Sequence, residues 1–152
     1  MLSCVILGQQ SLCAEGWTTN IGSNSCYKFF NVRVTWETAK NNCRNLSAPS
    51  PAHLSVPNNV FDYNGIVELL VASESVENNV WLGLSDKETE GVFIDANTGE
   101  EIALPSSFTI GWGANQPNTT PDYDCIIVDK EFPQYFTDKC LKSHPYVCEY
   151  HR

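Results

Sequence analysis

The sequence has few basic residues and no long apolar run. Lysine and arginine together number 9 against 18 aspartates and glutamates, which gives a formal net charge of −9. A chain this poor in cations is unsuited to neutralising phosphates, so we expect no nucleic-acid partner. No stretch approaches the roughly 20 consecutive apolar residues that a membrane-spanning helix requires, and we therefore expect no membrane span.

Sequence signals of catalysis are also missing. His53, His144 and His151 stand in no recognisable motif, and no serine lies in a nucleophile turn. The spacing from Cys140 to His144 is too sparse for a zinc site. There is no internal repeat, low-complexity tract or interdomain linker, and 152 residues can bury a hydrophobic core. We expect a single domain that is not an enzyme.

The acidity is concentrated in one third of the chain. Eleven acids but only two bases lie between Asp86 and Asp138, whereas the remaining residues are balanced in charge. Such a stretch suits cation binding. It is equally typical of a solvated acidic face that keeps a protein soluble, and charge alone does not choose between the two.

Seven cysteines and two Asn-x-Ser/Thr sequences, beginning at Asn45 and Asn118, indicate an oxidising compartment, disulfide bonds and N-glycosylation. We predict a secreted, extracellular protein. Residues 1–12 are a short apolar leader without a basic start, interpreted as the remnant of a signal peptide before a domain at 13–150. Cys4 is lost with this leader or, if it is retained, could join two chains into a homodimer.

The hydrophobic pattern predicts two helices. The first begins after Thr35, a suitable N-cap, and places four apolar side chains on one stripe: Trp36, Ala39, Cys43 and Leu46. The second runs from about Val60 to Ser73, with Asn58 or Asn59 as its cap. Gly65 weakens this second prediction. Its apolar face consists of Ile66, Leu69 and Leu70.

Short apolar segments predict strands near the start, middle and end of the chain. A hairpin is expected between Cys13 and Cys26, and further strands at 80–84, 91–95, 124–130 and 146–150. Between residues 97 and 121 there is no period of either helix or strand, which in a compact domain is typical of a functional loop. The stretch from Gly111 to Cys125 is rich in oxygen-bearing side chains suited to a hard cation.

Several motifs at fixed spacing together resemble the C-type lectin domain. They are Trp36-x-x-Ala39-x-x-x-Cys43, Trp81-Leu-Gly-Leu84, Trp112 before Gln116-Pro-Asn118, Asp124-Cys125, Cys140 and Pro145-Tyr-Val-Cys148, while Cys13, Gly16-Trp17 and Cys26-Tyr27 resemble the long form of that domain. The resemblance implies an α+β fold with two helices, small antiparallel sheets and a long loop region for calcium and sugar. It also implies a cis Pro117 and three disulfides: Cys13 with Cys26, Cys43 with Cys148, and Cys125 with Cys140.

The same resemblance implies a sugar-binding calcium site around Pro117. Gln116 and Asn118 would each offer a carbonyl oxygen to Ca²⁺ and an NH₂ group to a sugar hydroxyl. Tyr123 stands where the family has an acid, so Asp122 is the residue that could take this role. A glycan attached to Asn118 would prevent both contacts.

The last element of that site is altered in this sequence. Tyr135-Phe-Thr-Asp138 replaces the family's Trp-Asn-Asp. Counting back from Cys140 places Phe136 and Thr137 at the ligand positions, so that neither calcium ligand of the family's Asn-Asp pair is retained. Aligning on the acid gives Thr137 and Asp138 instead, which keeps Asp138 as a calcium ligand and sugar contact. A second family site, which braces the loop, is matched by Asp86, Glu90 and Asp124; the bland alternative is three ordinary exposed acids.

Together these residues imply a calcium-dependent lectin for mannose- or galactose-type glycans on microbial or cell surfaces, with Ca²⁺ as its cofactor. Gln116-Pro-Asn118 offers two donors and no acceptor carboxylate, which predicts weaker selectivity and weaker calcium binding. The alternative is a calcium-independent module of the same fold that binds a protein or a solid surface such as ice or mineral.

Overall fold

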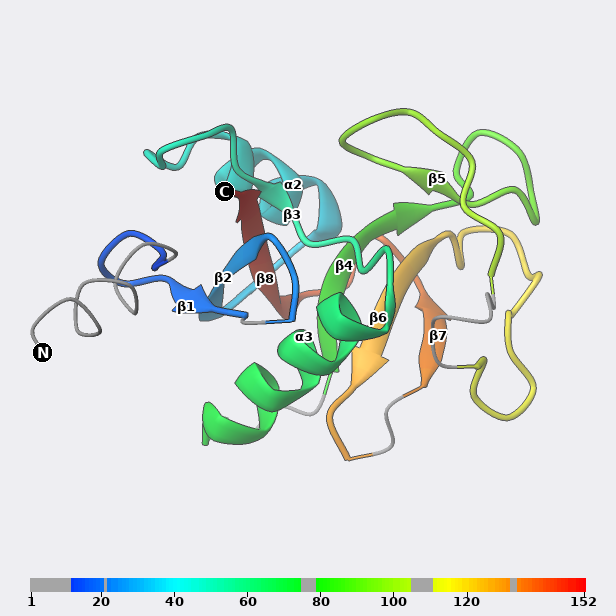
Figure 1. Ribbon diagram of the computed structural model, residues 1–152. Helices are drawn as coiled ribbons and strands as arrows, with labels where there is room; N and C mark the ends of the chain where they lie inside the picture. The colour runs from blue at the N-terminus through cyan, green and yellow to red at the C-terminus, as the bar shows by residue number, and fades with distance from the viewer. Residues whose placement is uncertain (1–11, 21, 75–78, 105–110, 132–133) are drawn as a thin grey trace, which may run out of the picture.

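The computed structural model describes residues 12–20, 22–74, 79–104, 111–131 and 134–152 (Figure 1). Residues 1–11, with Cys4, lie outside the described residues, as does 105–110 of the long loop. The expectations for the leader and for a Cys4 bridge therefore stay predictions. The described elements are β1 (Thr18–Thr19), β2 (Ser25–Val34), α2 (Trp36–Arg44), β3 (His53–Leu54), α3 (Val60–Ala72), β4 (Asn79–Ser85), β5 (Ile94–Asp95), β6 (Cys125–Asp129), β7 (Tyr135–Asp138) and β8 (His144–His151).

Helix α2 begins where its cap predicts. The Thr35 hydroxyl accepts a hydrogen bond from the Thr38 backbone N–H at 3.3 Å, which satisfies one of the free amides of the first turn. The predicted stripe is buried at three of its four positions: Trp36, Ala39 and Cys43. The helix ends at Arg44, so the prediction was wrong in placing Leu46 on it. Leu46 nevertheless packs against the same cluster from the following turn.

Helix α3 is capped by Asn59, whose side-chain oxygen accepts from the Asp62 backbone N–H at 2.9 Å. Its inner face carries Ile66 and Leu70, as predicted. Gly65 is explained by packing, because a Cβ atom there would lie 2.5 Å from the Asn20 Nδ2 atom. Glycine thus allows the β1–β2 hairpin to approach the helix.

The strands form one sheet in the order β1-β2-β8-β4-β6-β7, with β3 added to β8 and β5 to β4. All the pairings are antiparallel except that of β4 with β8, where Trp81 lies opposite Tyr146 in a parallel contact. The antiparallel parts predicted from the sequence are therefore joined at this one place, as the neighbouring β8 and β4 ribbons in Figure 1 show.

Strand β4 is buried on both faces. Val80, Leu82 and Leu84 pack in the cluster that includes the inner face of α3. Trp81 points the other way, into the cluster around α2, because successive strand side chains alternate. The Trp36 indole donates to the Leu82 carbonyl at 2.8 Å and so joins α2 to the strand. This burial explains the continuous apolar run in the sequence.

Three disulfides join the described cysteines in the pairing that the resemblance implied, and this prediction is confirmed. The pairs are Cys13–Cys26, Cys43–Cys148 and Cys125–Cys140. The first closes the hairpin, the second ties α2 to β8, and the third ties the start of β6 to the turn after β7. The loop region is thus held at its exit by a covalent bond.

Two strand predictions need correction. The strand predicted at 91–95 covers only Ile94 and Asp95, because Gly91 adopts φ +83° and the Val92 N–H bonds back to the Thr89 carbonyl in a turn. Strand β7 was not predicted. Its four residues are wholly or partly buried, so no alternation of apolar and polar residues marks it in the sequence.

Replacement of Gly83 by alanine should destabilise the protein by roughly 1–3 kcal/mol, the usual range for overpacking. A Cβ atom at Gly83 would lie 2.6 Å from the backbone carbonyl oxygen of Leu54, which cannot rotate away. The matched control is Gly111→Ala, since a Cβ atom there meets nothing within 4 Å. Denaturant unfolding with the disulfides intact measures both; equal stability of the two variants would contradict the close packing of β3 on β4.

Candidate functional site

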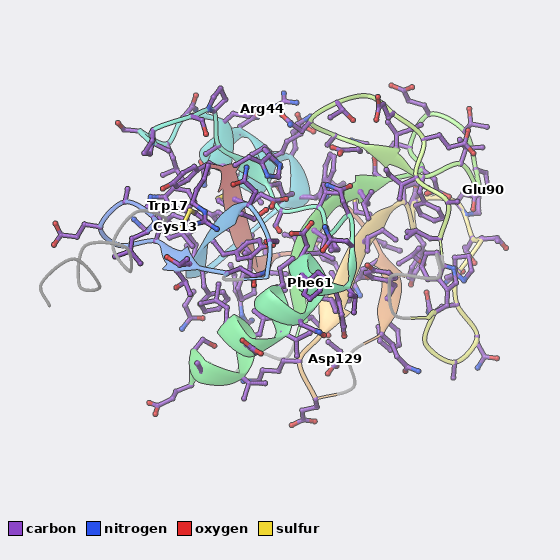
Figure 2. All side chains as sticks on the ribbon, in the orientation of Figure 1. Cys13, Trp17, Arg44, Phe61, Glu90 and Asp129 are labelled. Atoms are coloured by element: carbon purple, nitrogen blue, oxygen red, sulfur yellow. A yellow bond between two sulfur atoms is a disulfide. The ribbon has the colours of Figure 1, made fainter. Side chains whose placement is uncertain are left out.

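Three carboxylates converge where β4 ends and β6 begins. Asp86 directly follows β4, Asp124 directly precedes β6, and the Asp86 N–H donates to the Asp124 carbonyl at 2.9 Å. Glu90 comes from the turn after β4. One oxygen from each carboxylate lies within 4.8 Å of the others. The structure therefore brings together the set that the resemblance named. In Figure 2, Glu90 lies at the opposite end of the molecule from Cys13 and Trp17.

Asp86 supplies the buried part of this cluster. It is only 3% exposed; its Oδ2 atom accepts from the Gly91 N–H at 2.8 Å, and its Oδ1 atom has no hydrogen-bond partner among the described residues. Burial, together with the charges of Glu90 and Asp124, raises the pKa of Asp86 to about 6. An orphaned carboxylate oxygen beside two further carboxylates fits a hard divalent cation such as Ca²⁺.

The loop around Pro117 is fastened to β7 through Thr137. The Gln116–Pro117 peptide is cis, as the resemblance implied. The Gln116 Oε1 atom accepts from the Thr137 N–H and hydroxyl, both at 2.9 Å, and from the Asn118 N–H at 3.2 Å. The Asn118 Oδ1 atom accepts from the Thr120 N–H at 2.9 Å. Both amide oxygens are thus engaged within the protein, and the groups left to face a ligand are the amide NH₂ donors.

The other two predicted ligands of this upper site are Asp122 and Asp138. Asp122 is exposed and has φ +79°. Asp138 is buried, and its Oδ1 atom contacts Lys142 Nζ at 2.9 Å while its Oδ2 atom contacts His144 Nε2 at 2.8 Å. Although burial acts to raise the pKa of Asp138, the hydrogen bonds from Lys142 and His144 hold it below its ordinary value.

Thr137 joins the loop around Pro117 to β7. It takes a ligand position whether the segment is aligned on Cys140 or on the acid, and in the structure it is hydrogen-bonded to Gln116 and Asn118. A cleft of about 240 Å³ adjoins these residues and is lined by Asn79, Gln116, Ile127, Asp129, Phe136, Thr137 and Asp138. The loop and β7 therefore share one small hollow.

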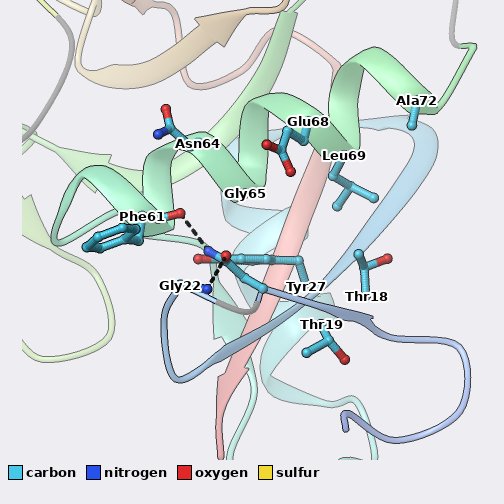
Figure 3. Close-up of a pocket in the computed structure, with 11 residues that line it drawn as sticks. Thr18, Thr19, Gly22, Tyr27, Phe61, Asn64, Gly65, Glu68, Leu69 and Ala72 are labelled. Carbon is cyan, nitrogen blue, oxygen red and sulfur yellow. Dashed lines mark hydrogen bonds between the residues drawn. The ribbon is translucent and has the colours of Figure 1, made fainter. Parts of the chain in front are cut away.

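A larger cavity, which the sequence did not indicate, lies between α3 and the β1–β2 hairpin (Figure 3). Its volume is about 530 Å³, and Phe61, 55% exposed, forms part of its wall. The Asn20 amide donates to the Phe61 carbonyl at 2.6 Å across one end. Glu68 is its only charged lining residue in the described part of the chain, so this cavity lacks the carboxylate set of the loop region.

The fold and the loop geometry define a class of protein. This is a disulfide-bonded α+β domain that presents a carboxylate cluster and an amide-bearing loop at one end, which is the arrangement of a binding module. The sequence profile of the Lectin C-type domain matches residues 32–150, and the chain belongs to the C-type lectin domain family. The domain of this family is a carbohydrate-binding fold.

Individual relatives agree with this assignment. Echinoidin from Heliocidaris crassispina is 30% identical over 121 residues, which cover 74% of this chain and 78% of echinoidin. The C-type lectin CEL-I from Cucumaria echinata superposes with a TM-score of 0.77 at 22% identity, over 90% of this chain and 96% of CEL-I. A protein described as a calcium-independent type II antifreeze protein superposes with a TM-score of 0.71 at 21% identity, over 92% and 95% of the two chains.

Neither helix in the described part of the chain combines the length and the apolar character needed to cross a bilayer.

The variant Asp86→Asn should stabilise the calcium-free protein at pH 7 by up to about 2 kcal/mol. It keeps an acceptor for the Gly91 N–H and removes a charge beside Glu90 and Asp124. Because the pKa of Asp86 is higher in the folded protein than in the unfolded chain, the calcium-free wild type should gain stability as the pH falls through about 6. Denaturant unfolding of the wild type and the variant in EDTA, across this pH range, measures both effects. If the stability of the variant depended on pH as that of the wild type does, the role given to Asp86 would be contradicted.

Proposed function

We propose that this protein is a secreted lectin that binds glycans at the loop around Pro117, and that it does so when Ca²⁺ is held by Asp86, Glu90 and Asp124. The observation that carries the proposal is the convergence of these three carboxylates on a buried Asp86 oxygen that has no hydrogen-bond partner in the described part of the chain. The ion would supply the charge that offsets their repulsion. The backbone hydrogen bond between Asp86 and Asp124 already holds two of the three ligands in place.

The sugar contact follows from what the loop leaves exposed. Since the oxygens of Gln116 and Asn118 accept hydrogen bonds within the protein, their NH₂ groups are the atoms that can donate to sugar hydroxyls. Two donors without an acceptor carboxylate discriminate poorly between hydroxyl arrangements, which supports binding of mannose- or galactose-type glycans with modest selectivity. Glycans on microbial or cell surfaces are the partners we propose.

A second calcium ion could bind only if existing contacts within the protein were broken. Its ligands would be Gln116, Asn118, Asp122 and Asp138. Gln116 Oε1 would have to exchange three hydrogen bonds for a bond to the ion, and Asp138 would have to leave Lys142 and His144. Each such hydrogen bond is worth about 1 kcal/mol net, more where a charge is involved. We keep this site as part of the proposal and assign it the weaker affinity.

The oxidised full-length protein should be retained on a mannose or galactose resin in Ca²⁺ and released by EDTA. Glu90→Gln should lose this retention, because it removes one of the three carboxylates. Glu88→Gln is the matched control: it removes another exposed acid of the same turn that is not part of the cluster. Retention on neither resin, with no heat of calcium binding in calorimetry, would overturn the proposal.

Asp138→Asn should weaken the second calcium-binding step by about tenfold or more, which calorimetry would resolve as a change of about 1.4 kcal/mol. Lys142→Gln is the control, since it breaks the same ion pair but leaves the carboxylate free to bind. If Asp138→Asn leaves affinity and stoichiometry unchanged, Phe136 and Thr137 occupy the ligand positions instead.

One observation favours a second candidate function, a calcium-independent module that binds a protein or a solid surface such as ice or mineral. The Gln116 Oε1 atom ties the upper loop to β7 through the N–H and hydroxyl of Thr137. A loop held by its own hydrogen bonds can present its surface without calcium. Retention of a partner in EDTA, with full activity of Glu90→Gln, would select this function over the first.

Four further proposals concern the whole protein. Secretion is supported by the disulfides, and the domain is proposed to span 13–150 after a leader at 1–12. Asn45 is exposed at the end of α2 and is not part of the loop around Pro117, so it is the acceptor we favour over Asn118. A homodimer through Cys4 is proposed only for a chain that keeps its leader.

A further inference from the structure

Three metal-ligating side chains meet on one face of the sheet, outside the loop region. His53 on β3 lies directly opposite Glu149 on β8 in the antiparallel register. His151 is two residues further along β8, so it points to the same face as Glu149. One ligand atom from each of the three residues lies within 4.8 Å of the others. The strand register thus places two imidazoles and one carboxylate together.

The spacing of the two imidazole rings matches shared coordination of one ion. Their centroids are 5.5 Å apart and their planes are inclined at 43°. With metal–nitrogen bonds of about 2.0–2.1 Å, two imidazoles on one tetrahedral ion have centroids about 5 Å apart. In a tetrahedral site with such bonds the ligand atoms lie about 3.3 Å apart, so the three side chains would have to approach one another to bind an ion.

Two of the donors are buried and lack a partner. The His53 Nδ1 atom lies 3.0 Å from the Leu54 carbonyl, which can only accept, so Nδ1 carries the proton and Nε2 keeps its lone pair. That Nε2 atom has no hydrogen-bond partner among the described residues, while Nδ1 lies 3.9 Å from Glu149 Oε1, and His53 is 5% exposed. Glu149 is 0% exposed; its Oε1 atom accepts from the Val56 N–H at 2.7 Å, and its Oε2 atom is also unpartnered.

The charge states of these groups suit a metal ion. Burial lowers the pKa of His53, so its ring is neutral and able to ligate at pH 7. Burial, with the charges of Asp62 and Asp95, raises the pKa of Glu149 to about 8. Binding of a dication would displace the proton on Glu149, and the negative charges of Asp62 and Asp95 would favour it. The positive charge of Arg44, which lowers the pKa of His53, would disfavour it.

We propose that His53, Glu149 and His151 form a binding site for a divalent d-block cation such as Zn²⁺, separate from the calcium loop. Two imidazoles select such ions over Ca²⁺, which prefers oxygen ligands. His151 is exposed, which leaves a path of entry and a fourth position open to water. The contact of Nδ1 with the Leu54 carbonyl is the kind of outer hydrogen bond that orients a ligating histidine. The proposal does not depend on glycan binding.

The test is calorimetric titration of Zn²⁺ into the oxidised full-length protein, without a histidine tag and with Ca²⁺ at saturation. We expect one saturable site and an increase in melting temperature on addition of Zn²⁺. Co²⁺ in its place should show the visible absorption of a tetrahedral site with nitrogen and oxygen ligands. No saturable Zn²⁺ binding, or displacement of Zn²⁺ by an equal concentration of Ca²⁺, would overturn the proposal.

Two variants test the ligands without threatening the fold. His151→Gln changes an exposed side chain, and Glu149→Gln keeps the acceptor for the Val56 N–H while it removes the carboxylate. Each should weaken Zn²⁺ binding at least about tenfold. His144→Gln, on the same strand, is the control for nonspecific binding to histidine and should bind Zn²⁺ as the wild type does. Equal affinity of all three variants would contradict the site.

Discussion

Burial of β4 on both faces is the constraint on which the rest of the structure depends. Its even-numbered residues from Val80 to Leu84 pack with α3, and Trp81 packs with α2, so one strand belongs to both cores. The same strand holds the only parallel pairing among the described strands, at Trp81 and Tyr146. Both helices and the two antiparallel parts of the sheet are therefore positioned relative to a single buried segment. The carboxylate cluster begins at Asp86, where this segment ends.

The loop region combines a rigid base with a more adaptable edge. At the base, the backbone bond from Asp86 to Asp124 fixes two like charges close together, which is unfavourable until a cation or a proton is bound. At the edge, the Gln116 Oε1 atom accepts hydrogen bonds from the Thr137 N–H and hydroxyl. Relatives with this fold include lectins and a protein described as calcium-independent.

The sequence was informative where local rules decide the structure. Thr35 and Asn59 cap helices because their side chains reach amides three residues on, and this reach is readable from spacing. The resemblance supplied the disulfides and the grouping of Asp86, Glu90 and Asp124. Strand β7 escaped prediction because its side chains contact different neighbours on each face instead of following a period. The partners of Asp138 could not be predicted, since they depend on how β7 and β8 are brought together.

The cluster of His53, Glu149 and His151 shows the same limit more clearly. Nearly a hundred residues separate its first two members, and no spacing rule connects them. Glu149 also directly follows Cys148, whose disulfide to Cys43 fixes β8 against α2. Consecutive strand residues face opposite ways, so the covalent tie and the ligand occupy opposite faces of one immobilised backbone. Binding of a ligand by Glu149 would consequently cost little conformational entropy of the chain, because the backbone of β8 is already ordered in the folded protein.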